Sequence, residues 1–168
     1  GLPEVYFADG PAGLRLISKR EGVNKRYYNT AFPIGSLLSS TWNTELVKNV
    51  GVSIGSEAKS YGVDLVLGPG VNLHRHPLCG RNFEYYSEDP FLTGHIGAAM
   101  INGIESEGIG ASPKHFAVNN QETSRNWNDA IVSERALREL YLKSFKIIVK
   151  ESQPWAIMTS YNKINGTY

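Results

Sequence analysis

The chain has 168 residues, of which 41% are hydrophobic and 20% are charged, a composition typical of globular domains rather than disordered segments. Seventeen Lys and Arg residues nearly balance sixteen Asp and Glu residues, which leaves no cationic surplus for nucleic acid or an anionic membrane. No apolar run reaches the roughly 18 residues that a membrane span requires, and the single cysteine, Cys79, excludes an internal disulfide. The sequence therefore predicts no nucleic-acid partner and no membrane partner, and it leaves the cellular location open.

The predicted secondary structure alternates between strands and helices. Short apolar segments typical of buried strands occur at residues 5–8, 64–67, 109–112 and 155–159. Apolar residues recur at helical intervals over residues 44–61, about 94–106, and from Ser133, a candidate N-cap, to residue 149. This alternation favours an α/β fold in which helices cover a parallel sheet, and it suits both a doubly wound sheet and a β/α barrel. Because no linker or low-complexity tract divides the sequence, residues 1–168 are expected to form a single structural unit.

Polar residues follow every predicted strand. Asp9 comes after the first strand and Arg81 lies in the loop after the second. Lys114 and His115 follow the third strand, and Tyr161 follows the fourth. Each of these residues alone is commonly part of a turn or a surface salt bridge. Because the carboxyl ends of parallel strands open on one face, their joint occurrence predicts a single binding site there.

The residue types suit a sugar. A pyranose presents a ring of hydroxyl groups, so its site needs carboxylates, cationic donors and an aromatic wall. Asp9 is suited to accept hydrogen bonds from two neighbouring hydroxyls. Arg81, Lys114 and His115 are suited to donate to others. The candidates for the aromatic wall are Trp42, Phe83, Trp127 and Tyr161.

Six segments together resemble the successive signatures of family 3 glycoside hydrolases, in the family's order and over nearly the whole chain. They are residues 9–15 (DGPAGLR), 67–73 (LGPGVNL), 80–84 (GRNFE), 114–116 (KHF), 133–139 (SERALRE) and 158–162 (MTSYN). The chain is most similar to bacterial β-glucosidases. The resemblance implies an incomplete segment of the family's N-terminal (β/α)8-type, or TIM-like, barrel domain. It also implies a retaining, exo-acting glycosidase that removes a terminal non-reducing β-D-glucosyl or related residue without a cofactor.

The resemblance also implies roles for individual residues. It implies substrate binding at seven positions, namely Asp9, Leu67, Arg81, Lys114, His115, Met158 and Tyr161. It implies a supporting role in the pocket for Arg15, Glu84 and Arg125.

Neither catalytic carboxylate is expected within this chain. In retaining enzymes one carboxylate attacks the anomeric carbon and a second protonates the leaving oxygen. The resemblance places the nucleophile in a Ser-Asp-Trp motif on the next strand and the acid/base on a following domain, and this sequence contains no Ser-Asp-Trp. The isolated chain is therefore expected to be inactive. Its expected partners are a β-glucoside or oligosaccharide substrate and the remaining domains of the same enzyme.

Two alternatives remain open from the residues alone. His74 and His76 have the His-x-His spacing of a zinc site, which leaves a metal-dependent hydrolase as an alternative, with Cys79, His95 and His115 as further ligands. Because no further ligand falls at a diagnostic spacing, no metal site is predicted. The second alternative is a non-catalytic carbohydrate-binding relative, since binding a sugar and hydrolysing its bond use the same wall.

Overall fold

The computed structural model describes residues 1–168 and has an α/β fold with parallel strands, as the sequence predicts. Its elements in chain order are β1 (Phe7–Asp9), α1 (Gly35–Ser39), α2 (Thr44–Ser60), β2 (Leu65–Leu67), α3 (Pro90–Glu105), β3 (Gly110–Ala111), β4 (Lys114–Phe116), β5 (Asp129–Ala130), α4 (Glu134–Ala136), a π-helical turn η1 (Leu137–Tyr141), α5 (Lys143–Glu151), β6 (Met158–Thr159) and β7 (Lys163–Ile164). No helix has the length and apolar content needed to cross a membrane.

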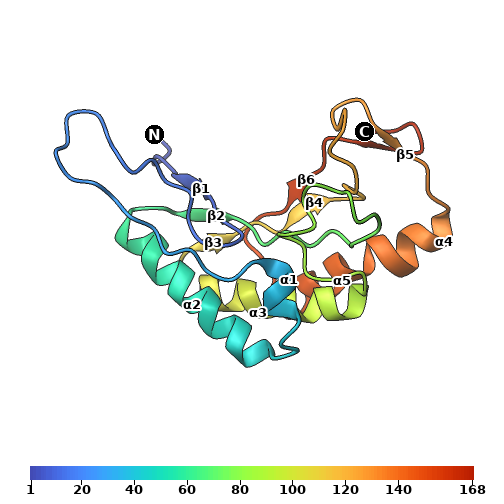
Figure 1. The fold of residues 1–168 in the computed structure, drawn as a ribbon, viewed down its shortest axis with the longest axis horizontal. Coiled ribbons are helices and arrows are strands. Elements are labelled where there is room, and N and C mark those ends of the chain that lie inside the picture. The colour runs from blue at the N-terminus through green and yellow to red at the C-terminus, as the bar shows by residue number, and fades with distance from the viewer.

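The strands form a parallel arrangement in which β1 pairs with β2 and β2 pairs with β3. After β3 the chain continues through two residues into β4, which pairs in parallel with β6, and a parallel bridge between Gly70 and Lys114 links β4 to the segment after β2. Four successive extended segments, namely β1, β2, β3 with β4, and β6, thus run side by side in the same direction. Their carboxyl ends lie at the same edge (Figure 1). This is the arrangement of part of a β/α barrel.

Helices α1, α2, α3 and α5 lie on one side of these strands (Figure 1). The core between the layers is built from fully buried aliphatic side chains, among them Val47, Ile54, Val66, Ile96, Met100, Ile101 and Ile148. Gly51 of α2 and Gly103 of α3 let the two helix backbones approach closely, because a Cβ at either position would overlap main-chain atoms of the other helix. Gly55 of α2 also lies against α3, because a Cβ there would overlap Ile104 O, so both glycines of residues 44–61 serve helix packing although glycine lowers helix propensity.

The predicted element boundaries are wrong at several places. Helix α3 starts at Pro90 rather than near residue 94, because Asp89 caps it by accepting from Phe91 N at 2.8 Å and proline is favoured in the first turn. Ser133 does cap a helix, accepting from Ala136 N at 3.2 Å. The single helix expected from Ser133 to residue 149 is instead divided by η1, where Leu142 N bonds to Leu137 O at 2.9 Å, five residues back. Apolar spacing does not reveal such a change of hydrogen-bond register.

A small lobe that the sequence did not predict stands beyond the end of β4. Its strands β5 and β7 pair in parallel. The Asn165 side chain holds the lobe together by accepting from Val132 N at 2.9 Å and donating to Val132 O at 2.8 Å. The lobe stands at the upper right of Figure 1, on the side of β4 and β6 and away from β1.

Candidate functional site

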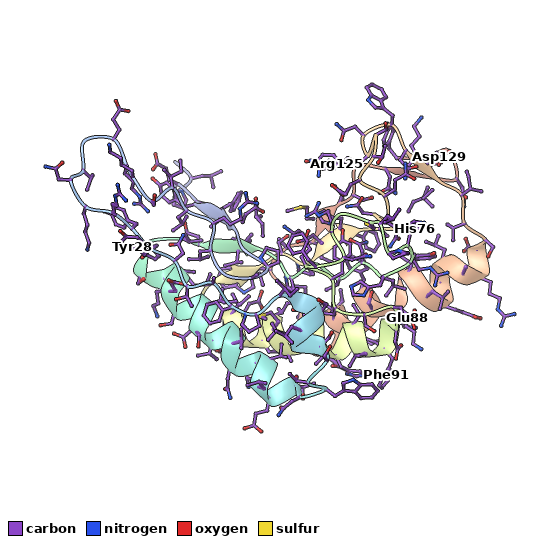
Figure 2. All side chains as sticks on the ribbon, in the orientation of Figure 1. Tyr28, His76, Glu88, Phe91, Arg125 and Asp129 are labelled. Atoms are coloured by element: carbon purple, nitrogen blue, oxygen red, sulfur yellow. The ribbon has the colours of Figure 1, made fainter.

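A cavity of about 440 Å³ lies at the carboxyl ends of β1, β2, β4 and β6. Twelve residues line this strand-end cavity: Asp9, Arg15, Leu67, Arg81, Phe83, Glu84, Lys114, His115, Glu122, Arg125, Met158 and Tyr161. All ten residues that the sequence assigns to the site are among them. Arg125, labelled in Figure 2, belongs to the loop between β4 and β5.

Buried charges are paired along one wall of the cavity. The side chains of Lys114 and Glu84 are each only 4% exposed. Lys114 Nζ lies 3.4 Å from Asp9 Oδ1 and 3.9 Å from Glu84 Oε2, and Glu84 also accepts from Arg81 Nε. Burial lowers the pKa of Lys114, and the carboxylates of Glu84 and Asp9 oppose that shift. Glu84 is therefore the buried carboxylate that both cations share, while Asp9 also faces Lys114 and Glu122 Oε1 lies 3.9 Å from Arg81 Nη1.

The orientation of His115 follows from Asn72, which is also buried. The Asn72 amide donates to His115 O at 3.0 Å and its Oδ1 accepts from His115 N at 2.8 Å. The same Oδ1 lies 3.1 Å from His115 Nδ1, so Nδ1 carries the proton. Burial, with Arg81, Lys114 and Arg125 nearby, lowers the pKa of His115 to about 3. The neutral ring therefore offers Nε2 as an acceptor, whereas the sequence predicted His115 as a donor.

This burial predicts a pH-dependent stability. In the unfolded chain His115 takes up a proton near its ordinary pKa of 6.5, whereas in the folded protein it stays neutral down to about 3. The neutral, buried His115 therefore contributes to the free energy of unfolding above pH 6.5. This contribution is lost as the pH falls toward 3, with a slope of about 1.4 kcal/mol per pH unit. Urea unfolding of the full-length gene product and of a His115→Gln variant between pH 7 and pH 4 measures this, and the wild type should lose more stability than the variant. Parallel pH profiles of the two proteins would contradict the assignment.

The aromatic wall consists of two of the four predicted residues. Phe83 and Tyr161 line the strand-end cavity, and each is 52% exposed. The Arg125 guanidinium lies 4.8 Å from the centre of the Tyr161 ring. Its Nη1 also forms an ion pair with Glu122 Oε2 at 3.0 Å. Trp42 lines a different depression, and Trp127 is 84% exposed and does not line the cavity. Glu122 was not predicted as a site residue, although its position three residues before Arg125 is the sequence signal of an ion pair.

The alternative of a metal site receives no support from the arrangement of the histidines. His74 Nε2 lies 2.9 Å from Tyr85 O, and His76 Nδ1 accepts from Leu78 N at 3.1 Å. His95 pairs with Glu151 on the surface. No group of three or more His, Cys, Asp or Glu side chains is placed to hold a metal ion.

Comparisons with known proteins agree with the geometry. The glycosyl hydrolase family 3 N terminal domain matches residues 8–168. The β-glucosidase A of Butyrivibrio fibrisolvens is 54% identical over 99% of this chain, and the exo-α-(1→6)-L-arabinopyranosidase of Bifidobacterium longum is 48% identical over the whole chain. The solved structure of β-glucosidase 3B from Thermotoga neapolitana in complex with α-D-glucose covers the whole chain with a TM-score of 0.98 and 56% identity.

The chain belongs to glycoside hydrolase family 3. It spans 19% and 23% of the lengths of the two curated relatives and 24% of the Thermotoga neapolitana chain.

Proposed function

We propose that this chain supplies the sugar-binding subsite of a retaining, exo-acting glycoside hydrolase of the β-glucosidase type. The observation that carries the proposal is the strand-end cavity, in which twelve residues from four parallel strands and their loops surround one space of about 440 Å³. That volume lies within the range of about 300 to 1,000 Å³ typical of small-molecule sites. The names of the related β-glucosidases support the same reaction.

We assign the terminal sugar of the substrate to this cavity. Asp9 is half exposed and uses one carboxylate oxygen on Lys114, so its other oxygen is available to sugar hydroxyls. Arg81 and Lys114 donate hydrogen bonds from the buried wall, and His115 Nε2 accepts a hydrogen bond from a hydroxyl group. Phe83 and Tyr161 are exposed enough to pack on the apolar face of the ring, and Leu67 and Met158 complete the lining.

The two catalytic carboxylates are proposed to come from sequence outside residues 1–168, on the rest of the barrel and on a following domain. The acids available in the cavity are already committed to cations: Asp9 to Lys114, Glu84 to Arg81, and Glu122 to Arg125. Such pairing suits binding and orientation rather than nucleophilic attack. One structural unit of 168 residues would then form one part of the barrel wall.

The test is hydrolysis of 4-nitrophenyl β-D-glucopyranoside by the full-length gene product, with the product anomer followed by proton NMR. Release of β-D-glucose as the first product, before mutarotation, is expected for retention. Because one relative is named an arabinopyranosidase, 4-nitrophenyl α-L-arabinopyranoside is assayed in parallel. Inversion would refute the retaining mechanism. Glucose binding without hydrolysis of either substrate would identify a non-catalytic carbohydrate-binding relative instead.

A further inference from the structure

Glu122 lies between two arginines that come from different loops of the strand-end cavity. Its Oε2 lies 3.0 Å from Nη1 of Arg125, which belongs to the same loop between β4 and β5. Its Oε1 lies 3.9 Å from Nη1 of Arg81, which belongs to the loop after β2. All three residues line the cavity. The Glu122 carboxylate therefore marks the place where the two loops meet.

Arg125 connects this carboxylate to the aromatic wall. Its guanidinium lies 4.8 Å from the centre of the Tyr161 ring, within the roughly 6 Å at which a cation attracts the face of a ring. The Arg125 side chain is 40% exposed and Tyr161 is 52% exposed, so burial alone does not fix either of them. The ion pair with Glu122 therefore contributes to the position of the guanidinium over the ring.

The backbone around Glu122 has a defined conformation of two successive turns. Arg125 N bonds to Glu122 O at 3.2 Å, and Trp127 N bonds to Ser124 O at 2.8 Å. Ser124 has a φ of 54°, in the left-handed region that residues other than glycine seldom adopt. This loop conformation brings the Glu122 and Arg125 side chains together.

The charges around the cavity explain why Arg125 needs a carboxylate beside it. Four basic and three acidic side chains line the space: Arg15, Arg81, Lys114, Arg125, Asp9, Glu84 and Glu122. Asp9 and Glu84 face Lys114, and Glu84 also accepts from Arg81. The one ion pair of Arg125 is with Glu122. Arg81, Lys114 and Arg125 all lie near His115, so without Glu122 the other two cations would repel the Arg125 guanidinium.

We propose that Glu122 is a positioning residue of the sugar subsite, which acts through Arg125 by holding its guanidinium against the Tyr161 ring. This inference rests on the proposed function, in which Tyr161 packs on the apolar face of the terminal sugar. With the ion pair in place, the ring is already ordered when the sugar binds. Without it, the guanidinium turns away from the other cations into solvent, and the ring has to be ordered by the sugar itself, which weakens binding.

The test measures hydrolysis of 4-nitrophenyl β-D-glucopyranoside by the full-length gene product. Glu122→Ala is expected to lower kcat/KM by about tenfold and to raise the inhibition constant of glucose by a similar factor. Glu122→Gln should keep kcat/KM within about threefold of the wild-type value, because the amide oxygen can still accept from Arg125 Nη1. A loss in Glu122→Gln as large as that in Glu122→Ala would contradict this reading of the contact.

A double-mutant cycle separates positioning from direct contact with the sugar. Arg125→Met removes the guanidinium and is expected to lower kcat/KM by about tenfold. Because Glu122 acts through Arg125, adding Glu122→Ala to Arg125→Met should lower kcat/KM by less than about twofold further. Glu134→Ala is the control for loss of a local ion pair with arginine, since Glu134 and Arg138 pair on the surface and both are mostly exposed. It should keep the wild-type kcat/KM, and melting temperatures report whether each variant folds.

The outcomes separate this inference from the proposed function. If the wild type hydrolyses the glucoside and Glu122→Ala keeps the wild-type kcat/KM, the positioning role is overturned and the proposed function stands. Losses of Glu122→Ala and Arg125→Met that multiply in the double variant also overturn it, because Glu122 then acts independently of Arg125. So does a Glu122→Ala variant that fails to fold while Arg125→Met folds. If the wild type does not hydrolyse the glucoside, the proposed function fails and the positioning role fails with it.

Discussion

Replacing Asp9 by asparagine in the full-length gene product is expected to lower kcat/KM for an aryl β-glucoside by about 30- to 1,000-fold, equivalent to roughly 2 to 4 kcal/mol of transition-state binding. The substitution keeps the shape of the side chain but removes the charge that faces Lys114 Nζ at 3.4 Å and that we propose accepts from sugar hydroxyls. Steady-state kinetics measures the loss. Because Asp9 is half exposed and has one protein partner, the melting temperature should change little.

Asp129→Asn is the matched control for this substitution. Asp129 lies in the β5 and β7 lobe, where its Oδ1 accepts from Gly166 N at 2.9 Å, a bond that an asparagine oxygen can keep (Figure 2). Its kcat/KM should equal that of the wild type. An unchanged catalytic efficiency for Asp9→Asn would remove Asp9 from the substrate site, and equal losses in both variants would indicate a general effect on folding.

Glu84→Ala is expected to destabilise the fold by about 3 to 5 kcal/mol, because it leaves Arg81 and Lys114 beside each other without their shared buried carboxylate. Glu84→Gln should cost less, since the amide oxygen can still accept from Arg81 Nε. The measurement is thermal unfolding of the full-length gene product, with the transition of this region followed by hydrogen exchange of the buried strand β2. The Ala variant should also lose activity at temperatures at which it remains folded, since both cations line the strand-end cavity.

Glu139→Ala serves as the control for the charge change alone. Glu139 pairs with Arg135 at 3.0 Å on the surface, where both side chains are mostly exposed, so its removal should change stability by less than about 0.5 kcal/mol. A Glu84→Ala variant as stable as Glu139→Ala would show that water or another acceptor already compensates the two cations. Adding Arg81→Met to Glu84→Ala should restore part of the lost stability, because it removes one of the uncompensated charges.

The sequence by itself predicted the fold class and ten of the twelve residues that line the strand-end cavity. Residues 65–67 and 110–111 are strands because short, fully apolar segments bounded by turn residues pair as buried parallel strands. Parallel strands place all their carboxyl ends at one edge of the sheet. The sequence therefore predicts that Asp9, Lys114 and Tyr161 lie close together. This inference uses only local periodicity and chain direction, which the sequence carries.

Only the tertiary structure decided how these residues are used. The protonation of His115 depends on Asn72, 43 positions away, and the pairing of Glu84 with Lys114 depends on the loop after β2 lying against β4. The π-helical turn η1 likewise arises from backbone hydrogen-bond register. Hydrogen-bond direction, burial and cavity shape are set by neighbours that folding brings together, and residue spacing along the chain does not encode them locally.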